Sequence, residues 1–452
     1  MTRLSSVRRA LAVLALPFAL GVAADPAMAQ SFRLDPEAVV PPGDALHVTL
    51  QDLTPGETVE ITAERAWGRG DERLWRSAAR YVADERGIVD LARHAPVSGD
   101  YAGADATGLF WSMRPTEAPP AAGQSSQDVR LVAHVSDGRD VSTSVRFASA
   151  DPAVRSREIP GFPAARLYVL PGDAPRPVVV VLHGAEGGVG ASERFGPRLA
   201  SLGYAVVGLP YYSPDWGAYG PPKAIPGLPG SFIDIPVDQL ESLRGWLKQQ
   251  PDADADRIAL FGGSKGAEFA LIAASRFDWI DAVAVFAPSD LVWEGWGLET
   301  LEAEGTRSSF SFEGEPLPFM PYVGFVEGLL AGPAADLLKI HEDGRAAHPG
   351  REAAARIPVE TYEGALMLVA GDLDRMWSSG RMARNIAASR AEAGLETELL
   401  LYPDAGHDVA GDGWAPTLEG VERGGGSPAG NARAQADAWP RLTAFLATHL
   451  GR

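Results

Sequence analysis

One serine and two later polar residues could together attack a carbonyl carbon. Ser264 lies in Gly262-Gly-Ser-Lys-Gly266, a G-x-S-x-G pattern between an apolar run at 257–261 and a helical pattern at 265–276. A serine on such a strand-to-helix turn projects its hydroxyl from the edge of a sheet, and the helix N-terminus favours developing negative charge. We therefore predict that Ser264 is a nucleophile. The alternative is a glycine-rich turn that begins an ordinary helix.

A serine nucleophile needs a base and an acid later in the chain. Among eight histidines, His407 follows the last expected strand and precedes the closing helix, which is where the order serine, acid, histidine places the general base. Two aspartates compete for the acid in Gly371-Asp-Leu-Asp374. The spacing Gly-x-x-Asp favours Asp374, which would fix the histidine tautomer. Asp372 would be a turn residue that bonds its own backbone.

Developing negative charge on a carbonyl oxygen requires two backbone donors. The first expected donor is the N–H of Lys265, directly after the serine. The second is expected in the loop His183-Gly-Ala-Glu-Gly-Gly188. There Ala185 is the first choice, but Gly184 and Glu186 remain open. His183 itself is expected to orient this loop.

Composition excludes several classes of function. The chain has 452 residues, a formal net charge of −19 and no cysteine. The negative charge argues against nucleic-acid binding, which needs a basic face, and the lack of cysteine excludes thiolate metal sites and a cysteine nucleophile. The sequence shows no paired histidines at metal-ligand spacing, so no metal or cofactor is predicted. The expected partner is a small acyl ester or thioester, and the oligomeric state stays open.

The first 29 residues resemble a secretory signal. Three arginines precede a nearly uncharged stretch from Ala10 to Ala24, which is too short to span a bilayer. Ala27-Met-Ala29 offers small residues for cleavage, so Gln30 would begin the mature chain. We expect export to the periplasm or medium, by the general secretory or the twin-arginine route, and no stable membrane insertion.

Short alternating segments between turn residues fill 30–150. Such segments indicate an all-β, immunoglobulin-like sandwich domain. The expected strands are 45–50, 58–62, 108–113, 129–135 and 142–147.

From 151 to 452 continuous apolar runs alternate with helical patterns, which indicates a mostly parallel, doubly wound sheet. The runs are 177–182, 204–209, 257–261, 282–286, 365–369 and 398–402, and the helices are expected at 237–250, 265–276, 380–393 and 433–450. An aromatic insert at about 290–356 would form a lid or acyl pocket. The run Gly424–Gly426 is expected to be a flexible loop.

Together these motifs resemble the acyl-CoA thioesterases and bile acid-CoA:amino acid N-acyltransferases. The resemblance rests on Gly262–Glu268, Gly203–Tyr212, Gly371–Trp377 and Tyr402–His407, and more weakly on Pro42–Glu57. It implies an α/β-hydrolase after the β domain, with Ser264, Asp374 and His407 as the triad. Transferases of this family use cysteine, so the serine implies hydrolysis. The loop after His183 is closer to dienelactone-type hydrolases, so no substrate contacts are carried over.

Other functions remain as alternatives. Export would separate the enzyme from coenzyme A, which would make it a carboxylesterase or an acyltransferase with another substrate. A secreted binding protein that has lost catalysis is the alternative from a different class. The serine, acid and base in the expected order argue against it.

Overall fold

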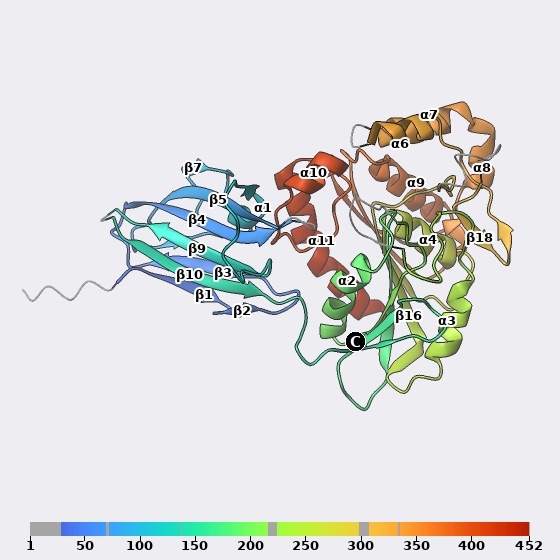
Figure 1. Ribbon diagram of the computed structural model, residues 1–452, viewed down its shortest axis with the longest axis horizontal. Helices are drawn as coiled ribbons and strands as arrows, with labels where there is room; N and C mark the ends of the chain where they lie inside the picture. The colour runs from blue at the N-terminus through green and yellow to red at the C-terminus, as the bar shows by residue number, and fades with distance from the viewer. Residues whose placement is uncertain are drawn as a thin grey trace, which may run out of the picture.

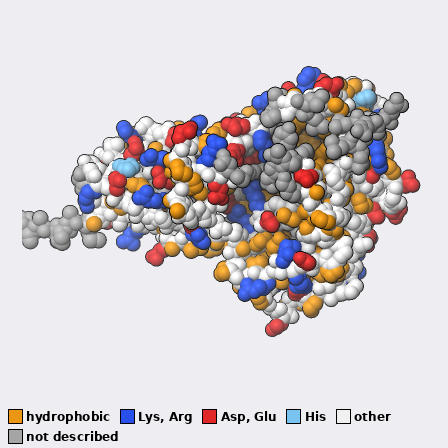
Figure 2. Space-filling model, viewed as in Figure 1, with side chains coloured by type: hydrophobic (Ala, Val, Ile, Leu, Met, Phe, Trp, Pro, Cys, Tyr) orange, Lys and Arg blue, Asp and Glu red, His pale blue; other side chains and the backbone are white. Residues whose placement is uncertain are grey.

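The structure, a computed structural model, describes residues 29–68, 72–136, 138–215, 224–297, 307–332 and 335–451. The expected signal segment therefore lies, apart from Ala29, outside the described residues. A β domain at one end of the chain stands beside a larger α/β domain, with α10 and α11 between them (Figure 1). Acidic and basic side chains are interspersed over the visible face of both parts (Figure 2).

Two sheets form the β domain and share one core. The smaller sheet has the order β1-β3-β6 and the larger β2-β10-β9-β4-β5-β7, with β8 paired to β5. Residues such as Leu50 in the first sheet and Ile61 in the second pack in the same buried cluster. The predicted sandwich is thus confirmed. Its strands are β1 (Ser31–Asp35), β2 (Val39–Val40), β3 (His47–Gln51), β4 (Thr58–Trp67), β5 (Arg73–Val82), β6 (Val89–Asp90), β7 (Ser98–Gly99), β8 (Arg114–Pro115), β9 (Asp128–His134) and β10 (Asp140–Phe147).

The strand expected at 108–113 is wrong. Gly108–Trp111 forms the short helix α1 instead, and all four of its residues are buried. Asp105 organises this turn, because its carboxylate accepts hydrogen bonds from the backbone and hydroxyl of Thr107 and from the indole of Trp111, each at 2.8 Å. An apolar run of this length fits either a strand or a buried helical turn, and here the aspartate decides for the turn.

The α/β domain is built on one eight-stranded sheet with the order β11-β12-β14-β13-β16-β17-β20-β21. From β14 onward all neighbours are parallel, as predicted, whereas β11, β12 and β14 pair antiparallel. The strands are β11 (Arg155–Glu158), β12 (Arg166–Val169), β13 (Arg176–Leu182), β14 (Ala205–Leu209), β16 (Ala253–Gly263), β17 (Ala282–Phe286), β20 (Ala365–Gly371) and β21 (Glu398–Tyr402).

Helices cover both faces of this sheet. Val178 and Val180 of β13 point into a cluster with α3 (Gln239–Leu247), α4 (Lys265–Ala274) and α9 (Ser379–Glu392). The intervening Val179 and Val181 face α2 (Gly190–Ser201) and α11 (Pro428–His449). Side chains alternate across a strand, so a continuous valine run fills both layers.

The insert lies between β17 and β20 and carries its own small elements. They are β18 (Phe310–Phe312), β19 (Glu315–Pro316), α6 (Phe325–Ala331), α7 (Leu337–Ala347), α8 (Glu352–Ala355) and the 3-10 helices at Pro349–Arg351 and Val359–Thr361. β18 pairs with β15 (Ile235–Pro236) and with β19 in a separate three-stranded sheet. Among the described helices, none is both long and apolar enough to cross a membrane.

Candidate active site

Ser264 lies between β16 and α4 in a strained backbone conformation, with φ +56°. Two glycines make the turn possible. A Cβ on Gly262 would lie 2.3 Å from the carbonyl oxygen of Gly266, and one on Gly266 would lie 2.4 Å from that of Leu182. The N–H of Ser264 donates to the carbonyl of Phe286 on β17 at 2.9 Å. Strain held this firmly by neighbouring backbone is typical of a functional position.

His407 and Asp374 meet at the same edge of the sheet, after β21 and β20. The ring Nδ1 of His407 lies 2.8 Å from Oδ2 of Asp374. The other carboxylate oxygen accepts the N–H groups of Met376 at 2.8 Å and Trp377 at 3.3 Å. The Asp374 side chain is fully buried, so it can hold the imidazole in one tautomer and offset its positive charge. Ser264 follows β16 and therefore opens on this same edge.

The electrostatics favour a charged imidazole at this position. Burial is the largest single effect on His407 and lowers its pKa. The Asp374 carboxylate, helped by Asp408 and Glu186, opposes burial, and the net effect raises the pKa above the ordinary value. The Trp377 ring stands edge-on to the imidazole, with centroids 5.9 Å apart. Trp377 in turn donates its indole N–H to the carbonyl of Ala287, at the end of β17. This indole links the acid loop to the strand beside the nucleophile.

Asp372, the competing aspartate, points elsewhere. Its carboxylate accepts two hydrogen bonds from Arg384 of α9, at 2.7 and 2.8 Å. The predicted bond to its own backbone is thus replaced by a surface ion pair. Of the two aspartates, the one that the Gly-x-x-Asp spacing favoured, Asp374, is the one whose carboxylate contacts His407.

The Gly424–Gly426 run, which we name the glycine clasp, is not the flexible loop expected. The carbonyl of Gly424 accepts the N–H groups of both His407 and Arg375, each at 3.0 Å. Gly425 forms an isolated antiparallel β-bridge with Asp374, and Gly426 forms one with Ala405. The clasp therefore ties the acid loop and the histidine loop together through backbone.

Side chains could not be accommodated in the glycine clasp. Gly425 and Gly426 have φ of +82° and +80°, and a Cβ on either would lie 2.3 Å from a neighbouring backbone atom. Asn431 of α11 completes the arrangement, since its amide accepts from the N–H of Gly406 at 2.7 Å and donates to the carbonyl of Gly425 at 3.3 Å. Sequence reasoning missed Asn431, because its partners lie in other segments of the chain.

The loop 183–188, which is expected to supply the second backbone donor, lies against Ser264. A Cβ on Gly184 would be 3.3 Å from the Cβ of Ser264. The N–H of Gly184 already donates to the Glu186 carboxylate at 3.1 Å, so Ala185 and Glu186 remain as second donors. His183 orients the loop as expected: its ring contacts the carbonyl of Gly184 at 2.7 Å and accepts from the N–H of Tyr211 at 3.1 Å.

A buried ion pair directly after the serine was missed. The ammonium of Lys265 lies 2.6 Å from the carboxylate of Glu268, and both side chains are almost fully buried. Lys265 also donates to the Ser309 hydroxyl at 2.8 Å, and Glu268 accepts the N–H of Trp293 at 3.0 Å. Burial lowers the pKa of Lys265 and raises that of Glu268, while each partner opposes the shift of the other. The sequence signal that could have revealed this ion pair is two opposite charges three residues apart in an otherwise apolar helix.

The same ion pair fastens the insert to the nucleophile turn. Ser309 and Trp293 both belong to the insert, and the rings of Phe232, Trp296 and Phe310 lie 5.0 to 5.6 Å from the Lys265 ammonium. Two aromatic residues of the insert, Trp296 and Phe310, therefore pack around Lys265, the residue after Ser264. Residues 298–306 of the insert lie outside the described part of the chain.

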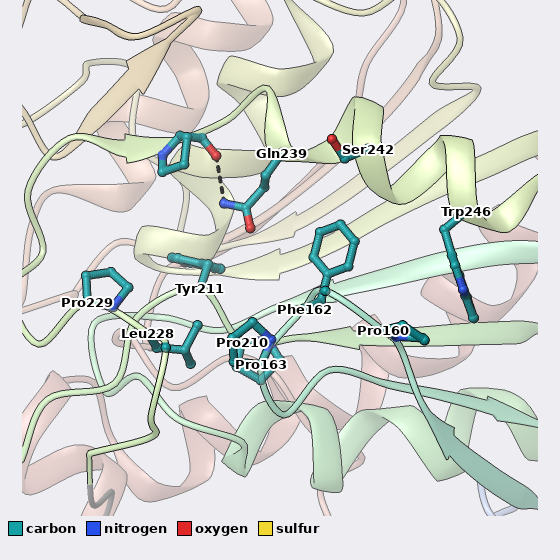
Figure 3. Close-up of a pocket in the computed structure, with 13 residues that line it drawn as sticks. Pro160, Phe162, Pro163, Pro210, Tyr211, Leu228, Pro229, Gln239, Ser242 and Trp246 are labelled. Carbon is teal, nitrogen blue, oxygen red and sulfur yellow. Dashed lines mark hydrogen bonds between the residues drawn. The ribbon is translucent and has the colours of Figure 1, made fainter.

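One surface pocket lies away from these groups. It has a volume of about 550 Å³ and is lined by Phe162, Tyr211, Gln239, Trp246 and several prolines (Figure 3). Neither Ser264 nor His407 contributes to its wall. In the described part of the chain, no three His, Asp or Glu side chains gather as a metal site would require.

Comparison with known protein families gives matches in both domains. Residues 43–149 match the acyl-CoA thioester hydrolase/BAAT N-terminal region, and residues 236–452 match the BAAT/acyl-CoA thioester hydrolase C terminal. Residues 164–302 match the dienelactone hydrolase family.

Curated relatives resemble nearly the whole chain. Human acyl-coenzyme A thioesterase 1 is 26% identical over 454 residues, which cover 94% of this chain and 98% of the relative. Mouse mitochondrial acyl-coenzyme A thioesterase 2 is 27% identical over 428 residues, which cover 90% and 87%. Among solved structures, a putative dienelactone hydrolase from Klebsiella pneumoniae has 15% identity and a TM-score of 0.39, over 65% of this chain and 98% of the other.

The mostly parallel sheet, the strained serine turn and the dienelactone hydrolase match define an enzyme of the hydrolase class, an α/β-hydrolase preceded by a β-rich domain. Matches to both regions of one family narrow this class further. The chain belongs to the acyl-CoA thioester hydrolase/BAAT family.

Proposed function

We propose that this protein hydrolyses acyl thioesters through a covalent acyl-enzyme on Ser264. The observation that carries the proposal is the 2.8 Å contact between His407 and Asp374, at the sheet edge where the strained serine also opens. Acyl-CoA thioesters are the first substrate class to test, because the curated relatives are named for them.

The mechanism has two half-reactions. His407 accepts the Ser264 proton through its Nε2 as the hydroxyl oxygen attacks the acyl carbonyl, and it delivers that proton to the departing thiolate. The N–H groups of Lys265 and Ala185 stabilise the oxyanion. His407 then deprotonates a water molecule, which attacks the ester carbonyl. As the bond to Ser264 breaks, His407 returns the proton to the serine oxygen, and the acid and the free serine are released. The Asp374 carboxylate accepts the hydrogen bond from the imidazolium Nδ1–H in both steps.

An exported carboxylesterase is the second candidate, favoured by the signal-like first 29 residues. An acyltransferase would use the same acyl-enzyme with an amine or alcohol in place of water. Export itself is tested by fractionating cells that express the full chain and sequencing the N-terminus of the recovered protein. A mature chain that starts at Gln30 supports export, and an intact cytosolic chain contradicts it.

The decisive experiment compares an acyl-CoA thioester with the p-nitrophenyl ester of the same acid. Faster turnover of the thioester supports thioesterase function, and faster turnover of the ester supports the second candidate. Ser264→Ala is the control and should abolish both activities. A fluorophosphonate probe should label the wild-type protein on Ser264 and leave the variant unlabelled. Equal activity of Ser264→Ala and wild type would refute the mechanism.

A further inference from the structure

One stretch of chain runs from the catalytic edge to the core of the β domain and back. After His407 the chain leaves the site and passes Trp414, whose ring packs against Phe110 and Phe147 of the β domain, with centroids 4.9 and 5.4 Å apart. Trp414 is buried in the core cluster of the β domain, although it belongs to the C-terminal part of the sequence. Arg65 on β4 donates to the Trp414 carbonyl at 2.8 Å.

From this anchor the chain returns to the site as one short helix. The N–H of Thr417 donates to the carbonyl of Trp111 at 3.3 Å. The helix α10 (Leu418–Gly424) follows at once, and Leu418 packs on the same β-domain cluster. At its far end is Gly424, whose carbonyl accepts from His407 and Arg375. Figure 1 shows α10 between the two domains.

The start of α11 repeats the connection. Ala432 is buried in the core cluster of the β domain, while its neighbour Asn431 bonds Gly406 and Gly425 beside the histidine. Adjacent residues thus contact the β domain and the catalytic loops. The glycine clasp is supported from the β domain at both of its ends.

We propose that the β domain positions the catalytic base and acid, acting through Trp414, α10 and the glycine clasp. This inference rests on the proposed triad. The segment 409–432 is seated in the β-domain core on one side and sets the backbone of His407 and Asp374 on the other. If Trp414 is unseated, α10 and the Gly424 carbonyl can shift, and the histidine–aspartate contact loosens. A misplacement of about 1 Å at such a contact can lower turnover by about 100-fold.

The test uses the full chain with Trp414→Ala and the milder Arg65→Met. The second variant removes the hydrogen bond to the Trp414 carbonyl, together with the bonds to the Ser126 carbonyl and the contact with the Trp67 ring, but keeps the Trp414 ring in place. Leu50→Ala, in the other sheet of the β domain, is the matched control for lost stability. Turnover, KM, melting temperature and the rate of Ser264 labelling by a fluorophosphonate are measured for each. We expect Trp414→Ala to lower kcat 10- to 100-fold with KM within about twofold, and Arg65→Met to lower it less. The ascending limb of the pH profile should move to lower pH, because His407 pairs less well with Asp374.

A purely structural role predicts a different pattern. Trp414→Ala would then lose no more kcat than Leu50→Ala at a comparable drop in melting temperature, and its pH profile would not move. That result overturns the inference, and so does unchanged labelling of Ser264 in a folded Trp414→Ala protein. If the wild-type serine is itself not labelled, the proposed triad fails and the positioning role fails with it. The Arg65→Met protein decides the question if Trp414→Ala does not fold.

Discussion

Removing the cation beside the nucleophile should destabilise the protein in a pH-dependent way. In Lys265→Met, the fully buried Glu268 keeps only the N–H of Trp293 at 3.0 Å as partner. Breaking a buried ion pair from one side costs about 3–5 kcal/mol, since the other charge is left uncompensated. For a domain of this size that corresponds to a drop in melting temperature on the order of 10 °C.

The pH dependence follows from the carboxyl group that remains. Burial already raises the pKa of Glu268 in the folded protein, and loss of Lys265 raises it further. Below about pH 4 the carboxyl is protonated in both the folded and the unfolded chain, so it contributes little. As the pH rises, the unfolded chain releases its proton first, and the folded state loses stability until the pH passes the raised pKa.

The assay follows tryptophan fluorescence during urea and thermal unfolding at pH 5, 6.5 and 8. Lys265→Met should lose most stability at pH 8. The matched variant Lys265→Met/Glu268→Gln keeps an acceptor for the Trp293 N–H without a charge, so it should recover at least half of the loss and show no added pH dependence. The reasoning is refuted if Lys265→Met loses less than about 1 kcal/mol at pH 8. It is also refuted if the double variant is as unstable as the single one.

Three further predictions concern the reaction. Because Asp374 raises the pKa of His407, kcat/KM should rise with pH along a limb whose midpoint lies above about pH 6.5. Asp374→Asn should move that limb to lower pH and reduce kcat by about 10³- to 10⁴-fold. Asp372→Asn removes only a partly exposed ion pair with Arg384, so a stopped-flow or steady-state assay should find kcat within twofold and a stability loss below about 1 kcal/mol; a loss of turnover like that of Asp374→Asn would contradict the choice of acid. The exposed Arg375 and Arg423 both adjoin Gly424, so their replacement by Met should raise KM for acyl-CoA, whose leaving group carries phosphates, and leave the N-acetylcysteamine thioester of the same acid unaffected.

Signals within one short segment were sufficient to predict much of the fold and the candidate site. The apolar run at 178–182 fits a strand covered on both faces, and the glycines around Ser264 fit a turn in which two backbones approach closely. The pairing of Asp374 with His407 was also predicted, because both residues follow strands that end at one sheet edge.

What the sequence did not reveal depends on partners far along the chain. Glycine in a row is a sign of flexibility, and only the neighbouring backbones of Leu373 and Gly406 turn Gly424–Gly426 into a clasp. Asp372 was expected to bond its own backbone, but its carboxylate accepts a hydrogen bond from Arg384 of α9 instead. In the sequence, Lys265 and Glu268 look like ordinary charged residues of a helix. Their burial depends on the insert, whose Ser309 and Trp293 bond them.

The position of β21 explains why the histidine needs support from outside the sheet. β21 is the last strand in the sheet order and all five of its residues are only partly buried, so the loop that carries His407 has a strand neighbour on one side alone. The Asp374 loop lies on that side. The glycine clasp bonds the backbone of both the Asp374 loop and the histidine loop, and so adds support that β21 alone does not give. Because backbone bonds hold the clasp, its geometry depends on where α10 and α11 are seated, and both helices are seated on the β domain. We therefore expect a loss of contacts with the β domain to weaken the support of His407, the proposed base, which follows an edge strand.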